Sequence, residues 1–343
     1  MSAAASLGPE DGATSRAHSA HAPAPEGRES RVAIACAADR RYALPLAVML
    51  RSAADHLGAE ATVDAYVLDD RIDPGDRRRV EASLDDRIAL HWICGEPADL
   101  AGLPLWGRMT ATTYRKLTLG RWLPEHVERA IWLDCDVLVL TDLRHLWRAD
   151  LRGRHALGVR DALVPRLASR FGVGAHRDLG LPGDAEYFNA GVLLTDVAAW
   201  RRDDVAGRAR DYLRRYADRV FFWDQEALNA VLAGHWGALD ARWNWHATGD
   251  RLARRAAPPP WILHFSGNLK PWSYAGTSPL HALYYRHLDR TAWRGWRPGR
   301  SWRGAMLSAY ESSRLRRFFY PAEQLGTRLV RALTLRPAAS DGA

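Results

Sequence analysis

Short apolar runs alternate with amphipathic stretches along residues 31–140 of the 343-residue chain. Apolar runs of this length are typical of strands buried in a sheet, and the pattern predicts them at 31–37, 61–70 and 88–94. Between these runs, apolar residues recur at helical spacing, with a glycine stop after the first stretch and a proline near the start of the second. The pattern therefore predicts helices at 42–58, 74–84 and 113–124.

The second half of the chain continues the alternation with longer polar segments. YFNAGVLLTD (187–196) predicts a polar loop that leads into a short strand, and the periodicity predicts helices at 205–218 and 224–234. After a Trp-rich stretch (234–246) and the break AAPPP, WILHFSGNLKPW (261–272) predicts a strand followed by a glycine-containing loop. No internal repeat is present.

Strands that alternate with helices predict an α/β fold with a mostly parallel sheet that helices cover on both faces. Ligands bind such sheets at the carboxyl ends of the strands. The loop AADRR (37–41) and the carboxylates of IWLDCDVLVL (131–140) fall at these ends. We therefore expect the functional site at this edge of the sheet.

IWLDCDVLVL places Asp134 and Asp136 among eight apolar residues. Positions two apart in a strand point the same way, so the carboxylates share a face or project together beyond the strand end. Buried like charges repel, so a cation, an arginine cluster or a proton must compensate them. The alternative is a strand that ends at Asp134, with both carboxylates capping loops and facing water.

Composition limits the classes of protein that this chain can be. No run of about 18 apolar residues is present, so the sequence predicts no membrane-spanning helix. Residues 1–30 are rich in Ala, Gly, Ser and Pro and lack the apolar middle of a secretory signal, which predicts a disordered leader. Three cysteines in apolar runs, Cys36, Cys94 and Cys135, predict reduced core thiols and a cytoplasmic location.

The net charge of +8 is concentrated at the C-terminal end. Residues 291–343 carry ten Arg and three acidic residues, so the rest of the chain is nearly neutral. A neutral body argues against nucleic acid as a partner, although the sequence pI is about 9.7. The chain has 46 Arg but only two Lys, Lys116 and Lys270, and a strongly Arg-biased chain that keeps two lysines suggests a function for both.

Asp134, Asp136 and His264 together offer an oxygen, oxygen and nitrogen ligand set that suits a divalent cation such as Mn²⁺. Such a site leaves coordination positions open for a phosphate-bearing substrate. Lys270 follows His264 by six residues and could supply positive charge to a diphosphate leaving group. For His264 alone, a hydrogen-bonded histidine at a strand end is the alternative interpretation.

Six segments in this order resemble the retaining glycosyltransferases of family 8, which include bacterial lipopolysaccharide galactosyl- and glucosyltransferases and, more distantly, glycogenin. The segments are IACAADRRYALPLAVMLRS, TTYRKLTLG, IWLDCDVLVL, YFNAGVLLTDVAAW, DQEALNAVL and HFSGNLKPW. The resemblance covers residues 31 to about 290 and implies a GT-A-type, Rossmann-like domain there. The chain would then consist of the leader 1–30, this domain at 31–290, and a basic aromatic helical tail at 291–343.

Carried over by motif, the resemblance implies a role for each site residue. The metal, Mn²⁺ or Mg²⁺, would be held by Asp134, Asp136 and His264. The donor, a UDP-sugar, would be bound by Ala37, Asp39, Arg41, Lys116, Gly267 and Lys270. The catalytic, sugar-facing group would consist of Asp161, Asn189, Asp224 and Gln225. Lys116 stands where the family often has Arg.

Each sugar-facing residue also has a structural interpretation. Asp224 could begin a helix with Gln225 in its first turn, Asn189 could be a turn residue, and Asp161 could be a surface acid. In the first loop, Arg40 and Arg41 replace residues that are acidic or small and polar in relatives. This departure leaves open whether Arg41 stacks on the base or pairs with a phosphate.

The implied reaction is transfer of a hexose, galactose or glucose, from a UDP-sugar to an acceptor hydroxyl with retention at the anomeric carbon. The resemblance favours front-face attack, in which a donor phosphate oxygen takes the acceptor's proton. The acceptor could be a glycan, a lipid-linked sugar or a small molecule.

The tail mixes arginines with aromatic residues and leucines at helical spacing over residues 293–336. This composition suits the surface of an anionic membrane, which predicts peripheral binding at the inner face of the cell membrane. The alternative is a terminal helix that packs on the domain.

Three other functions were weighed against a glycosyltransferase. A nucleotidyltransferase or sugar-nucleotide hydrolase would need the same metal site but not the sugar-facing group. A basic nucleic-acid-binding protein would need a basic body with interleaved aromatic residues. A catalytically silent binding module would not need intact metal ligands.

Overall fold

The computed structural model describes residues 31–95, 100–107, 109–247, 258–266, 270–276, 278–302 and 304–306. Its first half contains β1 (Arg31–Asp39), α1 (Ala43–Asp55), β2 (Thr62–Asp70), α2 (Pro74–Glu81), β3 (Ile88–Cys94), η2 (Ala111–Thr118), α3 (Leu119–Trp122), β4 (Arg129–Leu133), β5 (Val137–Val139), α4 (Arg144–Trp147) and β6 (Ala156–Arg160). The second half contains β7 (Phe188–Asp196), α5 (Val197–Arg202), α6 (Val205–Arg215), α7 (Trp223–Val231), β8 (Trp236–Ala238), η3 (Ala241–Asn244), β9 (Trp245–His246), β10 (Ile262–His264) and α8 (Pro279–Leu288).

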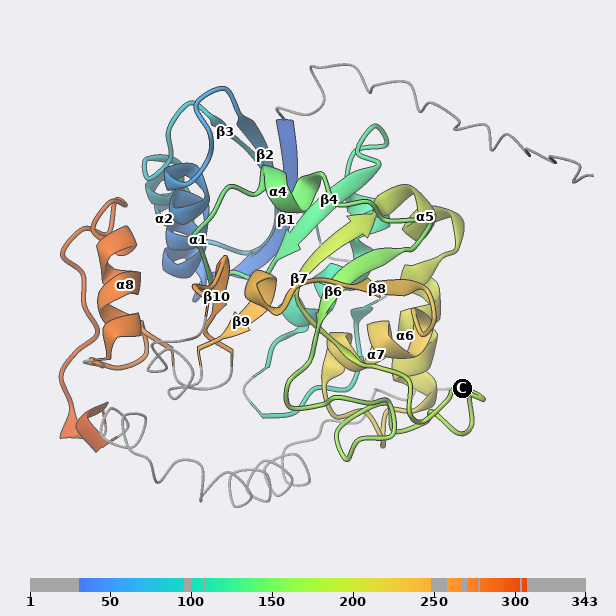
Figure 1. The fold of residues 1–343 in the computed structure, drawn as a ribbon. Coiled ribbons are helices and arrows are strands. Elements are labelled where there is room, and N and C mark those ends of the chain that lie inside the picture. The colour runs from blue at the N-terminus through green and yellow to red at the C-terminus, as the bar shows by residue number, and fades with distance from the viewer. Residues whose placement is uncertain are drawn as a thin grey trace, which may run out of the picture.

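A seven-stranded sheet in the order β3-β2-β1-β4-β7-β6-β8 forms the centre of the molecule (Figure 1). The pairs β1–β2, β2–β3, β1–β4 and β6–β8 are parallel, whereas β7 runs antiparallel to both of its neighbours. A second sheet of three strands, in the order β5-β10-β9, lies beside it. The prediction of a mostly parallel sheet flanked by helices is confirmed.

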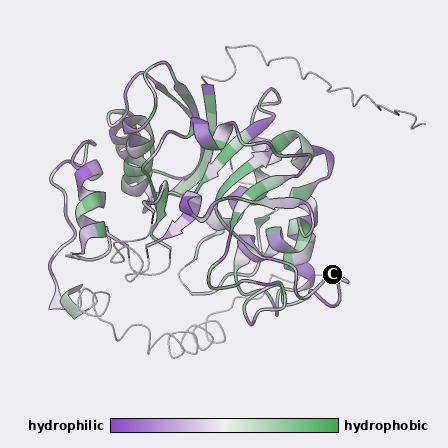
Figure 2. Cartoon of the chain, in the orientation of Figure 1, coloured by the Kyte–Doolittle hydropathy of each residue, from purple (hydrophilic) through white to green (hydrophobic). Residues whose placement is uncertain are grey.

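The alternation of side chains along the strands divides the core into two layers. Val32 and Ile34 of β1 belong to a buried cluster with α1, α8 and the small sheet, while Ala35 belongs to the cluster with η2, α5, α6 and α7. Figure 1 shows α1, α2 and α8 on one side of the sheet and α6 and α7 on the other. Hydrophobic positions gather on the central strands, between these two layers (Figure 2).

Three expectations about local structure were wrong. The segment predicted as one helix at 113–124 is mainly the 3₁₀ helix η2, which ends where the short α3 begins. β1 continues through Asp39, so AADRR is partly strand. Cys94 is an exposed thiol, because it ends β3, the edge strand of the large sheet, whereas Cys36 and Cys135 are buried.

Two features near the C-terminal end could not be foreseen from the pattern. Helix α8 begins at Pro279 and is capped by the Ser278 hydroxyl, which accepts from the His281 N–H, and it packs against α1. Trp293 is buried beneath the Arg79 guanidinium, whose carbon lies 4.2 Å from the ring centre.

In the part of the chain that the structure describes, no helix is long and apolar enough to cross a membrane.

Candidate active site

Asp134, Cys135 and Asp136 connect the two sheets. β4 ends at Leu133, and β5 begins at Val137 in the other sheet, so of the two arrangements left open by the sequence the strand ends before the aspartates, which project together beyond it. The Asp134 N–H donates to the Gly191 carbonyl (2.8 Å), and the Asp136 carbonyl accepts from the Phe265 N–H (2.9 Å). The two carboxylates are therefore fixed at the carboxyl end of β4 by both β7 and the residue that follows β10.

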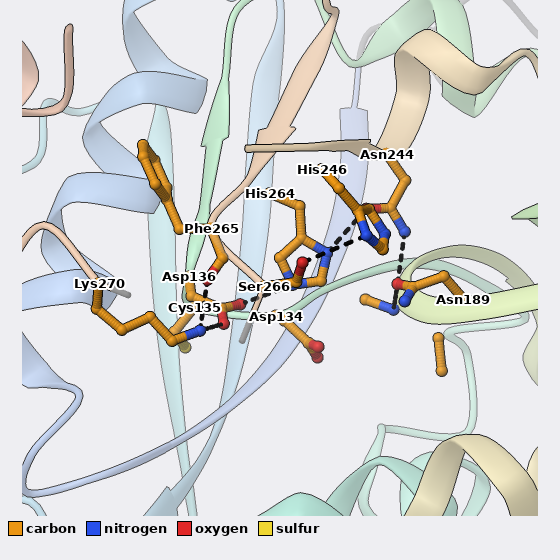
Figure 3. A network of polar contacts seen from close by, with 12 residues as sticks. Asp134, Cys135, Asp136, Asn189, Asn244, His246, His264, Phe265, Ser266 and Lys270 are labelled. Carbon is orange, nitrogen blue, oxygen red and sulfur yellow. Dashed lines mark hydrogen bonds and ion pairs between the residues drawn. The ribbon is translucent and has the colours of Figure 1, made fainter. Parts of the chain in front are cut away.

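Asp134, Asp136 and His264 meet at this connection (Figure 3). Each offers one ligand atom, and these atoms lie within 4.8 Å of one another. Asp136 Oδ1 is buried, accepts no hydrogen bond and lies 3.2 Å from His264 Nε2. Two carboxylate oxygens and an imidazole nitrogen that face one another in this way form a donor set that fits a divalent cation.

Lys270 lies against the Asp136 carboxylate. Its ammonium contacts Asp136 Oδ2 and donates to the Phe265 carbonyl (2.5 Å). Burial by itself would raise the pKa of Asp136, but Lys270 and then His264 outweigh burial and hold that pKa well below its usual range. Asp136 is thus ionised at neutral pH. Gly267, in the same predicted loop, lies outside the described residues.

Lys116 is buried between two carboxylates. Its ammonium lies 3.2 Å from Asp134 Oδ1 and 2.8 Å from Asp224 Oδ2. Burial would lower the pKa of Lys116, but the two carboxylates raise it above its ordinary value, so this cation stays charged. Asp134 Oδ1 also accepts from Trp132 Nε1 (2.7 Å), and Asp224 Oδ1 accepts from the Thr113 hydroxyl (2.6 Å).

Asp161 contacts two of the other three predicted sugar-facing residues. Its Oδ2 accepts from Asn189 Nδ2 (3.0 Å) and from Gln225 Nε2 (3.1 Å), while its Oδ1 accepts from two N–H groups of the following loop. Gln225 Oε1 in turn accepts from the Ala190 N–H (3.1 Å). Asp161, Asn189 and Gln225 therefore form one hydrogen-bonded group, whereas Asp224 joins the site through Lys116.

The first loop places Asp39 and Arg41 against each other. Asp39 Oδ1 accepts from the Arg41 N–H (2.9 Å), and its Oδ2 lies 3.1 Å from the Arg41 guanidinium and 3.3 Å from the Thr110 hydroxyl. The Ala37 carbonyl accepts from the Cys135 thiol (3.2 Å), which brings the end of β1 next to the aspartate segment. The predicted base-binding residues thus border the predicted metal ligands.

Asn244 is a site residue that the sequence reasoning missed. Its Oδ1 lies 2.8 Å from His264 Nδ1, and its Nδ2 donates to Asn189 Oδ1 (2.8 Å), as Figure 3 shows. The side chain is buried at the end of η3. The available signal was the tripeptide WNW, in which one polar residue lies between two large apolar ones. Thr113 and Trp132 were missed as well, and nothing in their sequence context distinguishes them.

The comparisons with known proteins agree with one another. The family model described as "Glycosyl transferase family 8" matches residues 33–276. General stress protein A of Bacillus subtilis (strain 168) is 26% identical over 279 residues, which cover 76% of this chain and 94% of that protein. Glycosyltransferase GlyF of Streptococcus pneumoniae serotype 4 is 27% identical over 282 residues, which cover 76% of this chain and 62% of that protein.

Among solved structures, the galactosyltransferase LgtC in complex with donor and acceptor sugar analogues is similar in fold. Its TM-score is 0.66 at 28% sequence identity, and the match covers 76% of this chain and 96% of that one. The mixed sheet with helices on both faces is thus a GT-A fold like that of LgtC.

Proposed function

Because the chain belongs to glycosyl transferase family 8 and is a glycosyltransferase, we propose that it transfers a hexose, galactose or glucose, from a UDP-sugar to an acceptor hydroxyl. The observation that carries this proposal is the meeting of Asp134, Asp136 and His264 beside two lysines. A nucleotidyltransferase or hydrolase has no use for the hydrogen-bonded group of Asp161, Asn189 and Gln225, and the family match favours a glycosyltransferase over both.

The proposed cofactor is Mn²⁺ or Mg²⁺, held by Asp134, Asp136 and His264. A divalent cation bound there supplies positive charge to the departing diphosphate. The ionised Asp136 and the buried His264 are suited to hold it, because one contributes a negatively charged oxygen and the other an imidazole nitrogen. Lys270 lies next to Asp136 and is placed to add a second positive charge where the leaving group forms.

We propose that the donor is bound along the edge from β1 to α7. Ala37, Asp39 and Arg41 lie at the base and ribose end, and Lys116 and Lys270 lie at the charged centre. Because the Arg41 guanidinium pairs with Asp39, we assign it to fixing the ribose-binding carboxylate, with its remaining N–H groups free for the nucleotide. Gly267, by its place in the family motif, is assigned to the diphosphate.

Retention of configuration is proposed to proceed by front-face attack. A covalent intermediate would need a carboxylate oxygen free to reach the anomeric carbon. Each oxygen of Asp224 already accepts a hydrogen bond, from Thr113 and Lys116. Gln225 is a neutral amide held at both ends, by Asp161 and the Ala190 N–H. These contacts support a mechanism in which a donor phosphate oxygen accepts the acceptor's proton.

The acceptor is proposed to be a glycan, a lipid-linked sugar or a small molecule.

The tail, residues 291–343, is proposed to hold the enzyme at the cytoplasmic side of an anionic membrane. Residues 291–343 carry ten Arg and three acidic residues. In the described part of this segment, Trp293 is buried against the domain, whereas Trp302 is 76% exposed and Met306 is 63% exposed. The tail beyond residue 306 lies outside the described residues. Binding to anionic vesicles should be salt-sensitive and lost on deletion of residues 307–343. If neither the full chain nor the shortened chain bound the vesicles, the proposed membrane-binding role of the tail would be wrong.

The experiment that tests the main proposal measures UDP release from a panel of UDP-sugars, with and without Mn²⁺. Asp136→Asn removes the charge of one predicted ligand at constant shape. Asp142→Asn is its matched control, because Asp142 is also a half-buried aspartate paired with a basic residue, Arg144, but lies away from the ligand set. We expect one donor to turn over with metal, with a loss of about 10² to 10³ in Asp136→Asn only. UDP release that is unchanged both without Mn²⁺ and in Asp136→Asn would refute the proposal.

A further inference from the structure

A histidine that binds a cation through one ring nitrogen must carry its proton on the other. Which nitrogen is protonated is decided by the partner of each. In His264, Nδ1 faces Asn244 Oδ1 at 2.8 Å and Nε2 faces Asp136 Oδ1 at 3.2 Å. The orientation of the Asn244 amide therefore decides which of the two imidazole nitrogens has a lone pair available to a metal.

A side-chain amide can present either its oxygen or its nitrogen, so its orientation must be deduced from neighbours of fixed polarity. Asn189 has two such neighbours. The Asp161 carboxylate only accepts, and the backbone N–H of Gly191 only donates. Asn189 must then turn Nδ2 to Asp161 (3.0 Å) and Oδ1 to Gly191 (3.0 Å).

The orientation of Asn189 determines the orientation of the Asn244 amide and, through it, the protonated nitrogen of His264. Because Asn189 presents its oxygen, Asn244 must present Nδ2 to it, at 2.8 Å, and keep Oδ1 for the imidazole. His264 must then donate from Nδ1, which leaves a lone pair on Nε2. Asp161, Asn189, Asn244 and His264 form this amide chain, and every polarity along it follows from its two fixed neighbours.

Packing keeps the imidazole in place. A Cβ atom on Gly191 would lie 2.3 Å from Cε1 and 2.7 Å from Nδ1 of His264, so the ring rests directly on the β7 backbone. Asn244 is 3% exposed and immediately precedes β9, where Trp245 and His246 pair with Leu263 and His264 of β10. This pairing holds the backbone of both residues in a fixed relative position.

We propose that Asn244 is a positioning residue that, through the amide chain, fixes His264 as the Nδ1–H tautomer and keeps Nε2 available to a divalent cation. The inference rests on the proposed function, in which His264 is a metal ligand. It assigns Asn189 and Asp161 a part in orienting the ligand, in addition to any contact with the donor sugar.

The first test reads the tautomer without metal. The full chain, labelled with ¹⁵N-histidine and kept metal-free at about pH 8, where an ordinary imidazole is neutral, is examined by NMR. The His264 signals are identified by their loss in His264→Gln. We expect a protonated Nδ1 and a lone pair on Nε2. The opposite tautomer in the wild-type chain would overturn the proposal, whatever any variant does.

The second test measures Mn²⁺ affinity by electron paramagnetic resonance. Asn244→Leu keeps the size but removes the acceptor, and we expect about 10- to 100-fold weaker binding and a mixed tautomer. Asn244→Asp restores an acceptor for Nδ1–H, so it should bind Mn²⁺ more tightly than Asn244→Leu. Thr195→Val is the control: it removes one buried hydrogen bond from β7, to the Ala130 carbonyl, away from the chain.

The outcomes separate the inference from the function on which it rests. If the wild type binds Mn²⁺ and Asn244→Leu binds it equally well, the positioning role is wrong and the metal site stands. If the wild type binds no Mn²⁺, the proposed function fails, and the NMR measurement still decides whether Asn244 fixes the tautomer.

Discussion

The ammonium of Lys116 lies 2.8 Å from the carboxylate of Asp224 and, on its other side, 3.2 Å from Asp134. One buried cation therefore compensates both a predicted metal ligand and the carboxylate at the start of α7. Asp224, which is buried, cannot lose this partner without leaving a negative charge in the interior.

Replacing Lys116 by Met should destabilise the protein by about 3 to 5 kcal/mol, because it leaves Asp224 buried and unpaired. Urea denaturation measures this loss. Lys116→Arg is the control, since it keeps a cation at the same place. A loss below about 1 kcal/mol in Lys116→Met would mean that Asp224 finds its compensation elsewhere.

Replacing Lys270 by Met should lower kcat by about 10² to 10³, because it removes a positive charge from the proposed leaving-group side. Mn²⁺ affinity should not fall, since Lys270 competes with a cation for Asp136 rather than holding it. Steady-state kinetics and Mn²⁺ titration measure the two quantities. Weaker Mn²⁺ binding with an unchanged kcat would contradict this role, and Lys270→Arg should retain much of the rate.

A methyl group on Gly191 should push His264 away from the carboxylates. In Gly191→Ala the new Cβ would meet the imidazole at 2.3 Å, and overpacking of this kind costs about 1 to 3 kcal/mol. We expect Mn²⁺ affinity to fall at least about 10-fold, as for other changes that reorient a ligand. Gly237→Ala is the matched strand variant, because its Cβ would meet the flexible end of Leu157. Equal Mn²⁺ affinities in the two variants would show that His264 tolerates displacement.

The stability of the protein should depend on His281 in mildly acid solution. Burial lowers the pKa of His281 from 6.5 to about 4. Between these values the unfolded chain binds a proton that the folded chain does not, so this contribution is complete above pH 6.5 and is lost as the pH falls towards 4. His281→Leu should remove about 3 kcal/mol of this pH dependence, which urea denaturation at several pH values would measure. A variant with the wild-type slope would show that other groups are responsible.

The alternating pattern was sufficient to predict β1, β2 and β3, because these strands are short, predominantly apolar runs. It left open where the strand in IWLDCDVLVL ends, because local periodicity does not reveal that Val137 pairs with a strand near residue 264 while Ile131 pairs with β1. The pattern predicts an α-helix where the chain forms η2, since 3₁₀ and α segments have almost the same composition over one or two turns.

The site was predictable only as a set of residue types in order. Asp134 and Asp136 are predicted because charged groups in an apolar run need compensation, and the lysines because the chain has only two. Their mutual pairing, Lys116 with Asp224 and Lys270 with Asp136, depends on the fold. Asn244 was missed because an amide has no charge to draw attention, and its importance follows only from what its two ends contact.

The short connection between the sheets also bears on how the protein folds. β5 can be completed only when β10 arrives, and the pairing Val137↔His264 closes a loop of more than 120 residues. Long-range pairings of this kind form slowly, because the loss of chain entropy precedes the contacts that offset it. During synthesis, the two aspartates leave the ribosome long before His264. During refolding, donor or metal affinity should appear only when this late pairing brings His264 to the aspartates. A ligand that binds there would favour the completed protein over every intermediate that lacks the final strand.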